Sequence, residues 1–466
     1  MLPFQLNLSC RPVLAVLGLL AAVLAPIFAG AAEPKQPNIV ILLADDLGWN
    51  DVSWNNPAIK TPNLDRLCRA GVRLARQYVH SMCTPTRAAL VSGRFATRFG
   101  IDVAQNERAL PYDTTTLMRV LDERGYDTAL IGKWHLGSAS QWGPQKYNFD
   151  YSYGALSGGC GPYSHLYKAG PYTRTWHRNG TLIEETGHVT DLIAREAVQW
   201  LGQRGDQPFF LYVPFTAPHV PVQEPARWLG EYPELTNPAK REFYAAVTHM
   251  DWAVGEIMQA LERTGRRADT IVIFLSDNGA TPDQPNESWL NVNDPRDHFT
   301  PGPAGGSNAP LRGRKTTVYE GGLRVPAFVN WPGLLKPGTF GGVVHVVDWM
   351  PTLCGLVGFQ PATDPKWDGR DLWPALTGRM PATSRQLYWV SARATVAAVR
   401  DGDWKLVVTK EGDRAELFNL AADPNEKRDL AAAEPKRVAA LRRLWAELAA
   451  RDGDAKVTET GPKVSD

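Results

Sequence analysis

Short, almost uninterrupted apolar runs recur along the chain, and each is followed by polar residues or glycine. The first run covers residues 38–44, and similar runs occur at 126–131, 209–213, 271–275 and 327–331. Runs of this length, rich in β-branched and aromatic residues, predict strands that are buried on both faces, as in a parallel sheet. Because helical patterns separate these strands, we predict an α/β fold with a large, mostly parallel sheet flanked by helices.

The helices of this domain are predicted by apolar periodicity and by residues typical of helix ends. Thr61 and Pro62 suit the start of one helix, and Gly71 suits its end. Further helices are expected over residues 114–124, 188–203 and 241–264.

A short apolar helix is also predicted directly after Cys83. Pro85 suits its first turn, Thr84 or Thr86 would cap it, and Gly93 would end it. The exposed N–H groups of a helix start attract anions, and the planar guanidinium of Arg87 adds hydrogen-bond donors suited to a tetrahedral oxyanion. Taken alone, the same pattern fits a small buried cysteine with no chemical role equally well.

The composition changes over residues 361–381, which we interpret as a linker. Short strands are then predicted at 386–390, 395–400, 404–409 and 416–419, with Asp401-Gly402 as a hairpin turn, and a helix at 436–450. We therefore expect a main domain over residues 37–380 and a small C-terminal α+β subdomain, an antiparallel sheet plus a helix, over 385–452.

The N-terminus has the pattern of a secretory signal peptide. Arg11 precedes an apolar run over residues 13–29, and small residues follow at a plausible cleavage site near Ala31. A retained membrane anchor is the alternative, but the run contains Pro26 and is short for a spanning helix. We expect a signal peptide over residues 1–31 and an exported protein, periplasmic or secreted, with no stable membrane anchor.

Bulk composition narrows the classes of partner. The formal net charge of the 466 residues is +1, which gives no global attraction for nucleic acid. The four cysteines beyond the signal peptide are widely spaced, and they form neither a disulfide framework nor a zinc motif. Any attraction for an anionic substrate must therefore be local.

Polar side chains follow four of the predicted strands directly. Because parallel strands end at one edge of a sheet, these side chains are expected to meet there. Three carboxylates and an amide offer oxygen ligands to a hard cation such as Ca²⁺ or Mg²⁺. Lys133 and Lys315, with Arg87, would surround an oxyanion with positive charge, as sulfuryl or phosphoryl transfer requires. The residues that follow the strands are Asp45, Asp46, Lys133, His135, His219, Asp277 and Asn278.

The chain resembles the type I, formylglycine-dependent sulfatases of the alkaline phosphatase superfamily, with an arylsulfatase-like pattern. The resemblance rests on several motifs in order and extends over nearly the whole chain after the signal peptide. It implies that residues 37–380 are a catalytic domain that hydrolyses sulfate esters to an alcohol and inorganic sulfate. The motifs are Ala44-Asp45-Asp46, Cys83-Thr-Pro85-Thr-Arg87 with Gly93-Arg94, Gly132-Lys133-Trp-His135-Leu-Gly137, Asp277-Asn278-Gly279 and Lys315 with Glu320-Gly-Gly322.

The resemblance also implies a role for each site residue. A maturation enzyme would oxidise Cys83 to Cα-formylglycine, whose hydrate has two hydroxyls, one to attack sulfur and one to expel sulfate. Arg87 would position this residue, and Lys133 and Lys315 would bind sulfate oxygens. His135 would act as base for the expulsion step, and His219, with Lys315, would protonate the leaving oxygen. The cation, usually Ca²⁺ with Mg²⁺ as the alternative, would be held by Asp45, Asp46, Asp277 and Asn278.

Two other functions fit parts of the pattern. The first is a phosphonate or phosphodiester hydrolase of the same superfamily, although the two-metal members place a histidine where Asn278 stands. The second is a non-catalytic, exported carbohydrate-binding protein with a degenerate sulfatase fold. The aromatic loops of residues 142–176 suit stacking on sugar rings, so we expect a sulfated glycan or a smaller sulfated molecule as the substrate.

Overall fold

Strand β1 (Asn38–Ala44) lies near the middle of an 11-stranded sheet. The computed structural model describes residues 36–457 except 290–293 and 410, together with Met1, Pro3 and Gln5. The signal peptide expected over residues 1–31 lies outside these residues, apart from the three isolated positions, and stays a prediction. None of the helices formed by the described residues is long and apolar enough to cross a bilayer.

The strand order of the sheet is β11-β2-β10-β8-β1-β7-β3-β4-β5-β6, and β9 pairs with β2. The central strands β8, β1, β7, β3 and β4 are parallel, whereas β10, β5 and β6 are antiparallel to their neighbours. The remaining bounds are β2 (Val72–Tyr78), β3 (Asp127–Ile131), β4 (Tyr151–Ala155), β5 (Trp176–Arg178), β6 (Thr181–Leu182), β7 (Phe209–Pro214), β8 (Thr270–Ser276), β9 (Arg324–Val325), β10 (Ala327–Asn330) and β11 (Gly338–His345).

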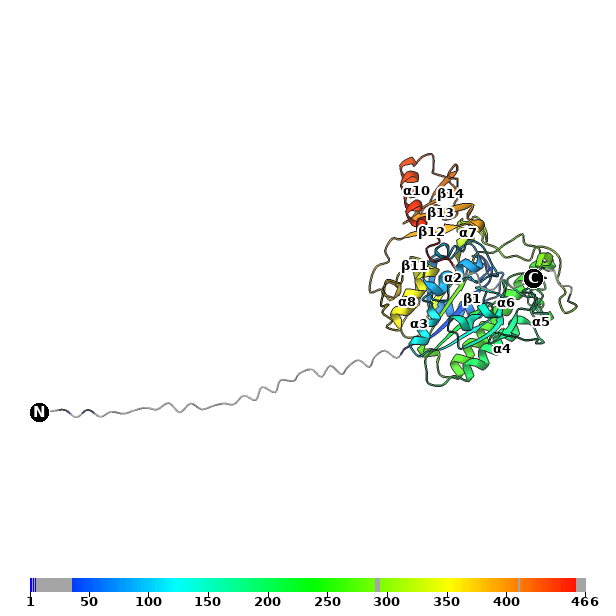
Figure 1. Ribbon diagram of the computed structural model, residues 1–466, viewed down its shortest axis with the longest axis horizontal. Coiled ribbons are helices and arrows are strands. Elements are labelled where there is room, and N and C mark those ends of the chain that lie inside the picture. The colour runs from blue at the N-terminus through cyan, green and yellow to red at the C-terminus, as the bar shows by residue number, and fades with distance from the viewer. Residues whose placement is uncertain (2, 4, 6–35, 290–293, 410, 458–466) are drawn as a thin grey trace. The chain divides into compact units, whose positions relative to one another are not determined.

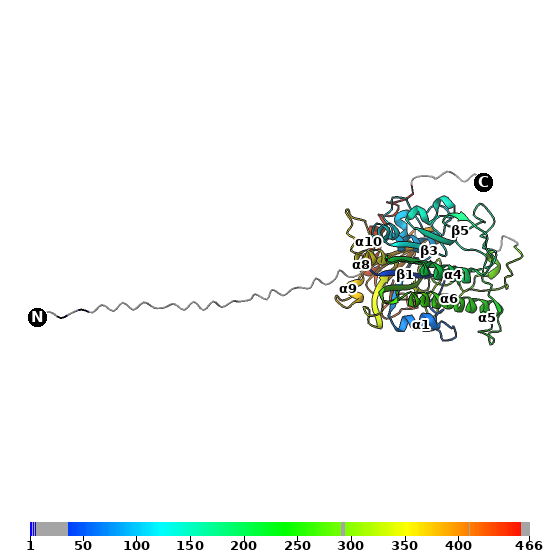
Figure 2. The ribbon, with the colours of Figure 1, turned by 90° about the horizontal axis from the view of Figure 1, so that it is seen from below.

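Helices cover both faces of this sheet (Figures 1 and 2). Apolar side chains of α1, α4 and α6 pack against one face, with Val40 and Leu42 of β1. Those of α2, α3 and α8 pack against the other, with Ile39 and Ile41. The bounds are α1 (Pro62–Arg69), α2 (Cys83–Ser92), α3 (Leu117–Glu123), α4 (Val189–Gly202), α5 (Ala226–Leu229), α6 (Pro238–Arg263), α7 (Glu320–Leu323), α8 (Trp349–Leu356) and α9 (Trp373–Leu376).

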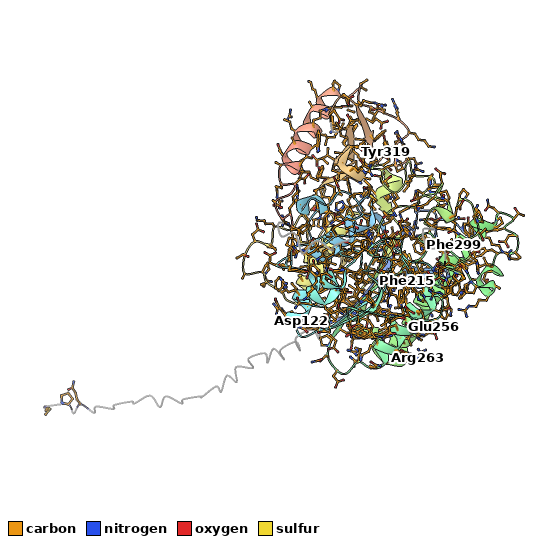
Figure 3. All side chains as sticks on the ribbon, turned by 45° about the vertical axis from the view of Figure 1, so that its right-hand side comes forward. Asp122, Phe215, Glu256, Arg263, Phe299 and Tyr319 are labelled. Carbon is orange, nitrogen blue, oxygen red and sulfur yellow. The ribbon has the colours of Figure 1, made fainter. Side chains whose placement is uncertain are left out.

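Side chains fill the layers between helices and sheet (Figure 3). Phe215, which follows β7, is fully buried in the layer beneath α6, whereas Arg263 at the end of α6 is exposed. The mixed sheet with helices on both faces confirms the predicted α/β class.

A second, antiparallel sheet of four strands follows near the C-terminus, in the order β12-β13-β14-β15. Helix α10 packs on it through Leu441 and Leu444 (Figure 1). The bounds are β12 (Gln386–Val390), β13 (Val396–Asp401), β14 (Trp404–Thr409), β15 (Ala415–Asn419) and α10 (Pro435–Ala449). These elements agree with the predicted small sheet and helix, and the domain boundaries at residues 37, 380, 385 and 452 stay predictions.

A buried ion-pair network joins the second sheet to the main one. The ammonium of Lys405 on β14 lies 3.0 Å from Glu320 of α7 and 2.8 Å from Glu426. Tyr78 of β2 donates a 2.6 Å hydrogen bond to Glu320. Burial raises the pKa of Glu426 above its ordinary value, although Lys405 opposes the shift. Lys405 thus lies between two buried carboxylates, and Arg324 and Arg400 add positive charge near Glu320.

Replacing Lys405 with methionine is expected to destabilise the protein by about 3–5 kcal/mol, because it leaves these two carboxylates without their cation. Urea unfolding at pH 7 measures the effect. The matched control is Lys427→Met, an exposed site next to Glu426, which is expected to change the free energy of unfolding by less than about 0.5 kcal/mol. Equal unfolding midpoints for the two variants would contradict the role given to the network.

Candidate active site

The candidate site lies at the carboxyl ends of four adjacent parallel strands, in the order β8, β1, β7 and β3. Each strand is buried along its whole length or nearly so, and its last residues lead into a loop that carries polar groups. The loops after these strands carry the following residues: Asp277 and Asn278, Asp45 and Asp46, His219, and Lys133 with His135. The expectation that the strand ends bring these residues to one edge of the sheet agrees with the structure.

Three carboxylates and one amide form the centre of the site. Asp46 has a left-handed backbone, with φ of 63°, and its N–H donates to Asp277 Oδ1 over 3.1 Å. The amide of Asn278 donates to Asp46 Oδ1 over 2.7 Å. Oδ1 of Asp45 and Oδ1 of Asn278 are buried and have no hydrogen-bond partner. Two unpartnered oxygens beside two further carboxylates are the donor set that a hard cation takes.

Basic side chains surround the carboxylates. Lys133 lies 2.5 Å from Asp45, and Lys315 lies 2.8 Å from Asp46. Burial raises the pKa of Asp45 to about 8, even though Lys133 opposes this shift. Burial would also raise the pKa of Asp46, but Lys315 and His219 outweigh it and hold that pKa below its ordinary value. The basic side chains of the protein therefore offset only part of the cost of burying an ionised Asp45 carboxylate.

Arg87 connects the helix of Cys83 to this centre. Its Nε and Nη2 both donate to Asp277 Oδ2, over 3.2 and 2.8 Å, and its Nη1 donates to the Lys133 carbonyl over 2.9 Å. The guanidinium is 1% exposed, so these bonds hold it in one position. Arg87 thereby fixes α2 against the ends of β8 and β3.

Cys83 is the first residue of α2, and all ten residues of this helix are buried. Gly93 ends the helix in a left-handed conformation, as predicted. The predicted cap is wrong: the residue at the N-cap position is Met82, and no side chain caps α2. Thr86 Oγ1 instead accepts the N–H of His80, and Thr84 Oγ1 accepts the N–H of Gln105. Both threonines instead tie neighbouring loops to the helix start.

Burial raises the pKa of the Cys83 thiol, although Lys133 and Lys315 oppose the shift. The unmodified side chain is therefore a neutral thiol at pH 7, and a neutral thiol is a poor nucleophile.

His80, three residues before Cys83, makes stability depend on pH. Burial, with Arg98 nearby, lowers its pKa to about 3. Between pH 6.5 and 3 the unfolded chain therefore binds a proton that the folded one does not, and stability falls as the pH is lowered through this window. From pH 7 to pH 5 the expected loss from this residue is about 2 kcal/mol.

Urea unfolding at pH 7 and pH 5 tests this expectation. The His80→Gln variant is expected to lose about 2 kcal/mol less than the unsubstituted protein between these pH values. His298→Gln, a change at an exposed histidine, is expected to leave the difference unaltered. An unchanged pH dependence in His80→Gln would contradict the assignment.

The two histidines predicted for the site reach it from different loops. His135 has a left-handed backbone, with φ of 56°, and its Nδ1 is buried without a partner. A Cβ on Gly158 would lie 2.5 Å from His135 Nε2, so glycine at 158 leaves room for the ring. His219 Nδ1 bonds the Val220 carbonyl, and its Nε2 lies 3.6 Å from Asp46. Burial lowers the pKa of both rings well below the ordinary value.

A cavity of about 320 Å³ opens onto these groups. Its wall includes Cys83, His135, His219 and Lys315, whereas Lys133 and Arg87 are fully buried behind it. Sequence reasoning did not single out the residues that complete the wall. Tyr167 and Lys168 fall in the predicted aromatic loops of residues 142–176. The loop between α2 and α3, by contrast, has no sequence pattern that indicates a binding role. The added wall residues include Gln105, Asn106, Tyr167, Lys168 and Gln284.

Comparison with known proteins decides the family. The family model described as "Sulfatase" matches residues 37–359, which is more than half of the chain. The chain belongs to the sulfatase family. A second model, described as "N-sulphoglucosamine sulphohydrolase, C-terminal", matches residues 314–452 of this sulfatase.

Curated relatives match this sulfatase over most of its length. It is 34% identical to N-acetylgalactosamine-6-sulfatase of Mus musculus, over 84% of this chain and 74% of the relative. It is 32% identical to arylsulfatase A of Homo sapiens, over 92% of this chain and 90% of the relative. The relatives are sulfuric ester hydrolases, and this sulfatase is an enzyme of the same class.

Solved structures agree with this assignment. The structure described as Ps i-CgsB in complex with k-i-k-neocarrahexaose has a TM-score of 0.80 and 29% identity to this sulfatase, and covers 91% of this chain and 96% of its own. PsFucS1 sulfatase from Pseudoalteromonas sp. has a TM-score of 0.74 and 25% identity, with 92% of both chains covered. The observed fold is thus the alkaline phosphatase-like fold of known sulfatases.

Proposed function

We propose that this sulfatase hydrolyses an O-sulfate ester of a carbohydrate by means of a formylglycine made from Cys83. One observation carries the proposal: Cys83 lies at the start of a fully buried helix, in the wall of the cavity, with Lys315 and both histidines beside it. Because the pKa of its thiol is raised there, cysteine itself is poorly suited to attack sulfur. A hydrated aldehyde at the same position would supply a hydroxyl nucleophile and a second hydroxyl for sulfate release.

We assign Asp45, Asp46, Asp277 and Asn278 to a bound cation. All four are buried, and two of their oxygens are without partners, so the residues present fit such an ion. Ca²⁺ accepts a shell built largely from protein oxygens, whereas Mg²⁺ usually keeps several waters, and we therefore favour Ca²⁺. When bound, the cation supplies Lewis-acid activation and positive charge next to residue 83.

The remaining residues would bind the sulfate group and move protons. Lys315 in the cavity wall and Lys133 behind it would bind sulfate oxygens, and Arg87 would hold residue 83 in place. The bond from His219 to the Val220 carbonyl requires a proton on Nδ1, so Nε2 of the neutral ring carries none. His219 would therefore help Lys315 to protonate the leaving oxygen only from the doubly protonated ring, through Nε2. His135, whose Nδ1 has no partner, would take up the proton during sulfate release.

A sulfated sugar unit suits the cavity. Its volume of about 320 Å³ is that of a site for a small ligand. Tyr167 offers an aromatic face at this site and Lys168 a positive charge, which match a sugar ring and a further anionic group. The relative N-acetylgalactosamine-6-sulfatase is named for a sulfated sugar, and Ps i-CgsB was solved in complex with k-i-k-neocarrahexaose. Both support a glycan or its fragment as the substrate.

Export and maturation belong to the same proposal. The predicted signal peptide would direct the chain to the periplasm or the exterior, without a stable membrane anchor. A formylglycine-generating enzyme would be a transient partner, because Cys83 does not oxidise to an aldehyde by itself. Nucleic acid is not expected as a partner, since the net charge is only +1.

Peptide mass spectrometry across Cys83 tests the modification, because replacing CH₂SH by CHO lowers the peptide mass. Rates with matched aryl sulfate and aryl phosphate esters test the reaction class, and a panel of sulfated sugars tests the substrate class. We expect a modified peptide, a preference for the sulfate ester and turnover of at least one sulfated sugar.

A strong preference for the phosphate ester would favour the phosphohydrolase alternative. An unmodified, inactive protein would favour a carbohydrate-binding role.

A further inference from the structure

A second cluster of potential metal ligands lies apart from the residues assigned to the sulfate site. Among the residues that the structure describes, two groups bring three His, Asp or Glu ligand atoms within 4.8 Å of one another. One is Asp45, Asp46 and His219. The other consists of His188, Glu224 and His249, and no motif spacing in the sequence connects its members.

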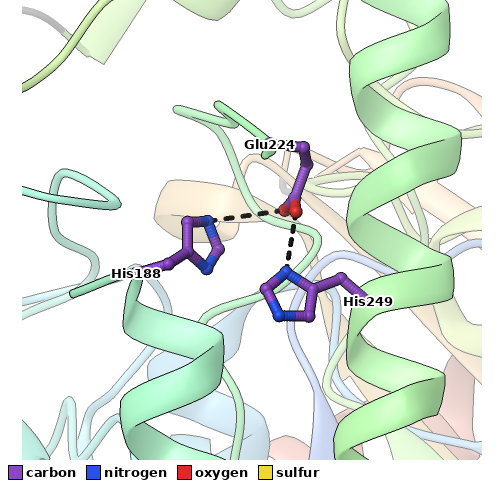
Figure 4. A group of neighbouring side chains, drawn as sticks. All are labelled: His188, Glu224 and His249. Carbon is purple, nitrogen blue, oxygen red and sulfur yellow. Dashed lines mark hydrogen bonds and ion pairs between the residues drawn. The ribbon is translucent and has the colours of Figure 1, made fainter. Parts of the chain in front are cut away.

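Three different elements contribute to this second cluster. His188 precedes α4, Glu224 lies in the loop before α5, and His249 lies within α6. In Figure 4 both imidazole rings direct a nitrogen at the same carboxylate. His249 Nδ1 lies 2.7 Å from Glu224 Oε2, and His188 Nε2 lies 3.6 Å from Glu224 Oε1. All three side chains are buried.

We infer that His188, Glu224 and His249 form a structural zinc site. Two imidazole nitrogens and one carboxylate are a ligand set typical of Zn²⁺. Ligand atoms about 2.0–2.1 Å from a tetrahedral Zn²⁺ lie about 3.3 Å from one another. The separation of 3.6 Å between His188 Nε2 and Glu224 Oε1 is close to this value and long for a direct hydrogen bond.

The surroundings supply the other requirements of such a site. His249 Nε2 lies 3.1 Å from Asp191 Oδ1, so this ring has the carboxylate that commonly orients a metal-bound histidine. A cavity of about 20 Å³, lined by His188 and Glu224, has room for one water as the fourth ligand. The His249 ring is held between the rings of His188 and Trp228, with centroid distances of 4.7 and 4.8 Å.

Without metal, the cluster is a hydrogen-bonded one. Glu224 and Asp191 then raise the pKa of His249, against the effect of burial. His188 Nδ1 accepts the N–H of Thr190 over 3.2 Å, which puts its proton on Nε2, and Nε2 donates it to the Gln223 carbonyl over 3.1 Å. Zinc would displace the proton shared by His249 and Glu224 and would shift the His188 proton to Nδ1. The helix cap from Thr190 and the bond from His188 Nε2 to the Gln223 carbonyl would both be lost.

The site would brace the loop that carries His219. Glu224 follows His219 by five residues, and its backbone N–H donates to Glu242 of α6 over 2.7 Å. A metal bond from Glu224 to α4 and α6 would therefore anchor the loop at one end. The role inferred is structural, and it does not depend on the modification of Cys83.

The experiment uses the full-length enzyme, stripped with a chelator and reloaded with Ca²⁺. Co²⁺ or Zn²⁺ is then added alone. We expect the intense visible absorption of tetrahedral Co²⁺, one tightly bound Zn²⁺ per chain, and a Tm that rises with free Zn²⁺. His249→Gln and His188→Asn are expected to lose all three signals, and asparagine at 188 keeps a side chain able to cap α4.

Two controls separate this site from the rest of the molecule. His177→Gln, at a buried histidine outside the cluster, and Asp46→Asn, at the sulfate site, are both expected to keep the cobalt spectrum and the zinc. A failure of the unsubstituted enzyme to bind Zn²⁺ would overturn the inference, as would equal binding by folded His188→Asn. In either case the cluster is a metal-free, hydrogen-bonded one.

Discussion

Cys83→Ala is expected to abolish sulfate ester hydrolysis while the protein stays folded. The substitution removes the atom from which the aldehyde would be made, and no other described side chain at the start of α2 offers a replacement. Loss of a nucleophile commonly costs about 10⁴-fold or more in kcat. Steady-state rates on an aryl sulfate and on the best sulfated sugar measure the loss, and circular dichroism with thermal unfolding confirms the fold.

The matched control is Cys160→Ala. Cys160 is also buried, its thiol pKa is also raised by burial, and it lines the small cavity next to His219. Alanine there is expected to change stability by about 1 kcal/mol and kcat by only a few-fold. If Cys83→Ala kept the activity of Cys160→Ala, the nucleophile proposed for this enzyme would be wrong.

Asp46→Asn is expected to reduce kcat by about 10³-fold, since a Lewis-acid cation is worth several kcal/mol to such a reaction. Asp46 accepts from Asn278 and pairs with Lys315, so its charge would link the proposed cation to the lysine proposed to bind sulfate. Chelation of the unsubstituted enzyme is expected to remove activity that Ca²⁺ restores. In Asp46→Asn, added Ca²⁺ is expected to restore little.

Asp51→Asn is the control for losing a buried carboxylate near the same loop. Asp51 is buried, and its oxygens accept the backbone N–H groups of Gly48 and Ser307. This variant is expected to lose stability and to keep a calcium-dependent kcat. Full activity of Asp46→Asn after exhaustive chelation would refute a catalytic cation held by this residue.

The fold also explains why the family assignment does not by itself fix the substrate. Lys133, Arg87 and the carboxylates are buried behind the cavity wall, where we propose that they meet only the sulfate group and the cation. Asn106, Tyr167 and Lys168 come from loops and line the cavity where the rest of the substrate would enter. Selectivity among sulfated sugars is therefore expected to depend on these loops.

The strand ends could be predicted because each apolar run and the polar residues that follow it are adjacent in the sequence. The run at residues 38–44 predicts β1 with its observed bounds, and Asp45 and Asp46 follow at once. Similar runs predict β7 and β8, so the positions of Asp277 and Asn278 at a strand end follow from pattern alone. Gly93 likewise marks the end of α2, since its left-handed backbone favours glycine.

Several elements escaped prediction because their patterns depend on distant neighbours. Strand β2 (Val72–Tyr78) carries Arg73, Arg76 and Gln77 among its apolar residues, yet it pairs with β10, β9 and β11. Its polar positions are accommodated by partners more than 200 residues away, such as Arg324, which bonds the Ala75 carbonyl. Strand β4 and the start of β5 fall within residues 142–176, where the sequence pattern predicts loops, for the same reason.

The sequence by itself determined the α/β class, the strand ends and the position of the motif proposed to be catalytic, because hydrophobic period and residue type act over a few residues. Only the tertiary structure decided which distant side chains share an environment. The pairing of Lys405 with Glu320 and Glu426, the residues lining the cavity, and the convergence of His188, Glu224 and His249 all join separate elements. Such groups are brought together by packing, which no local pattern records.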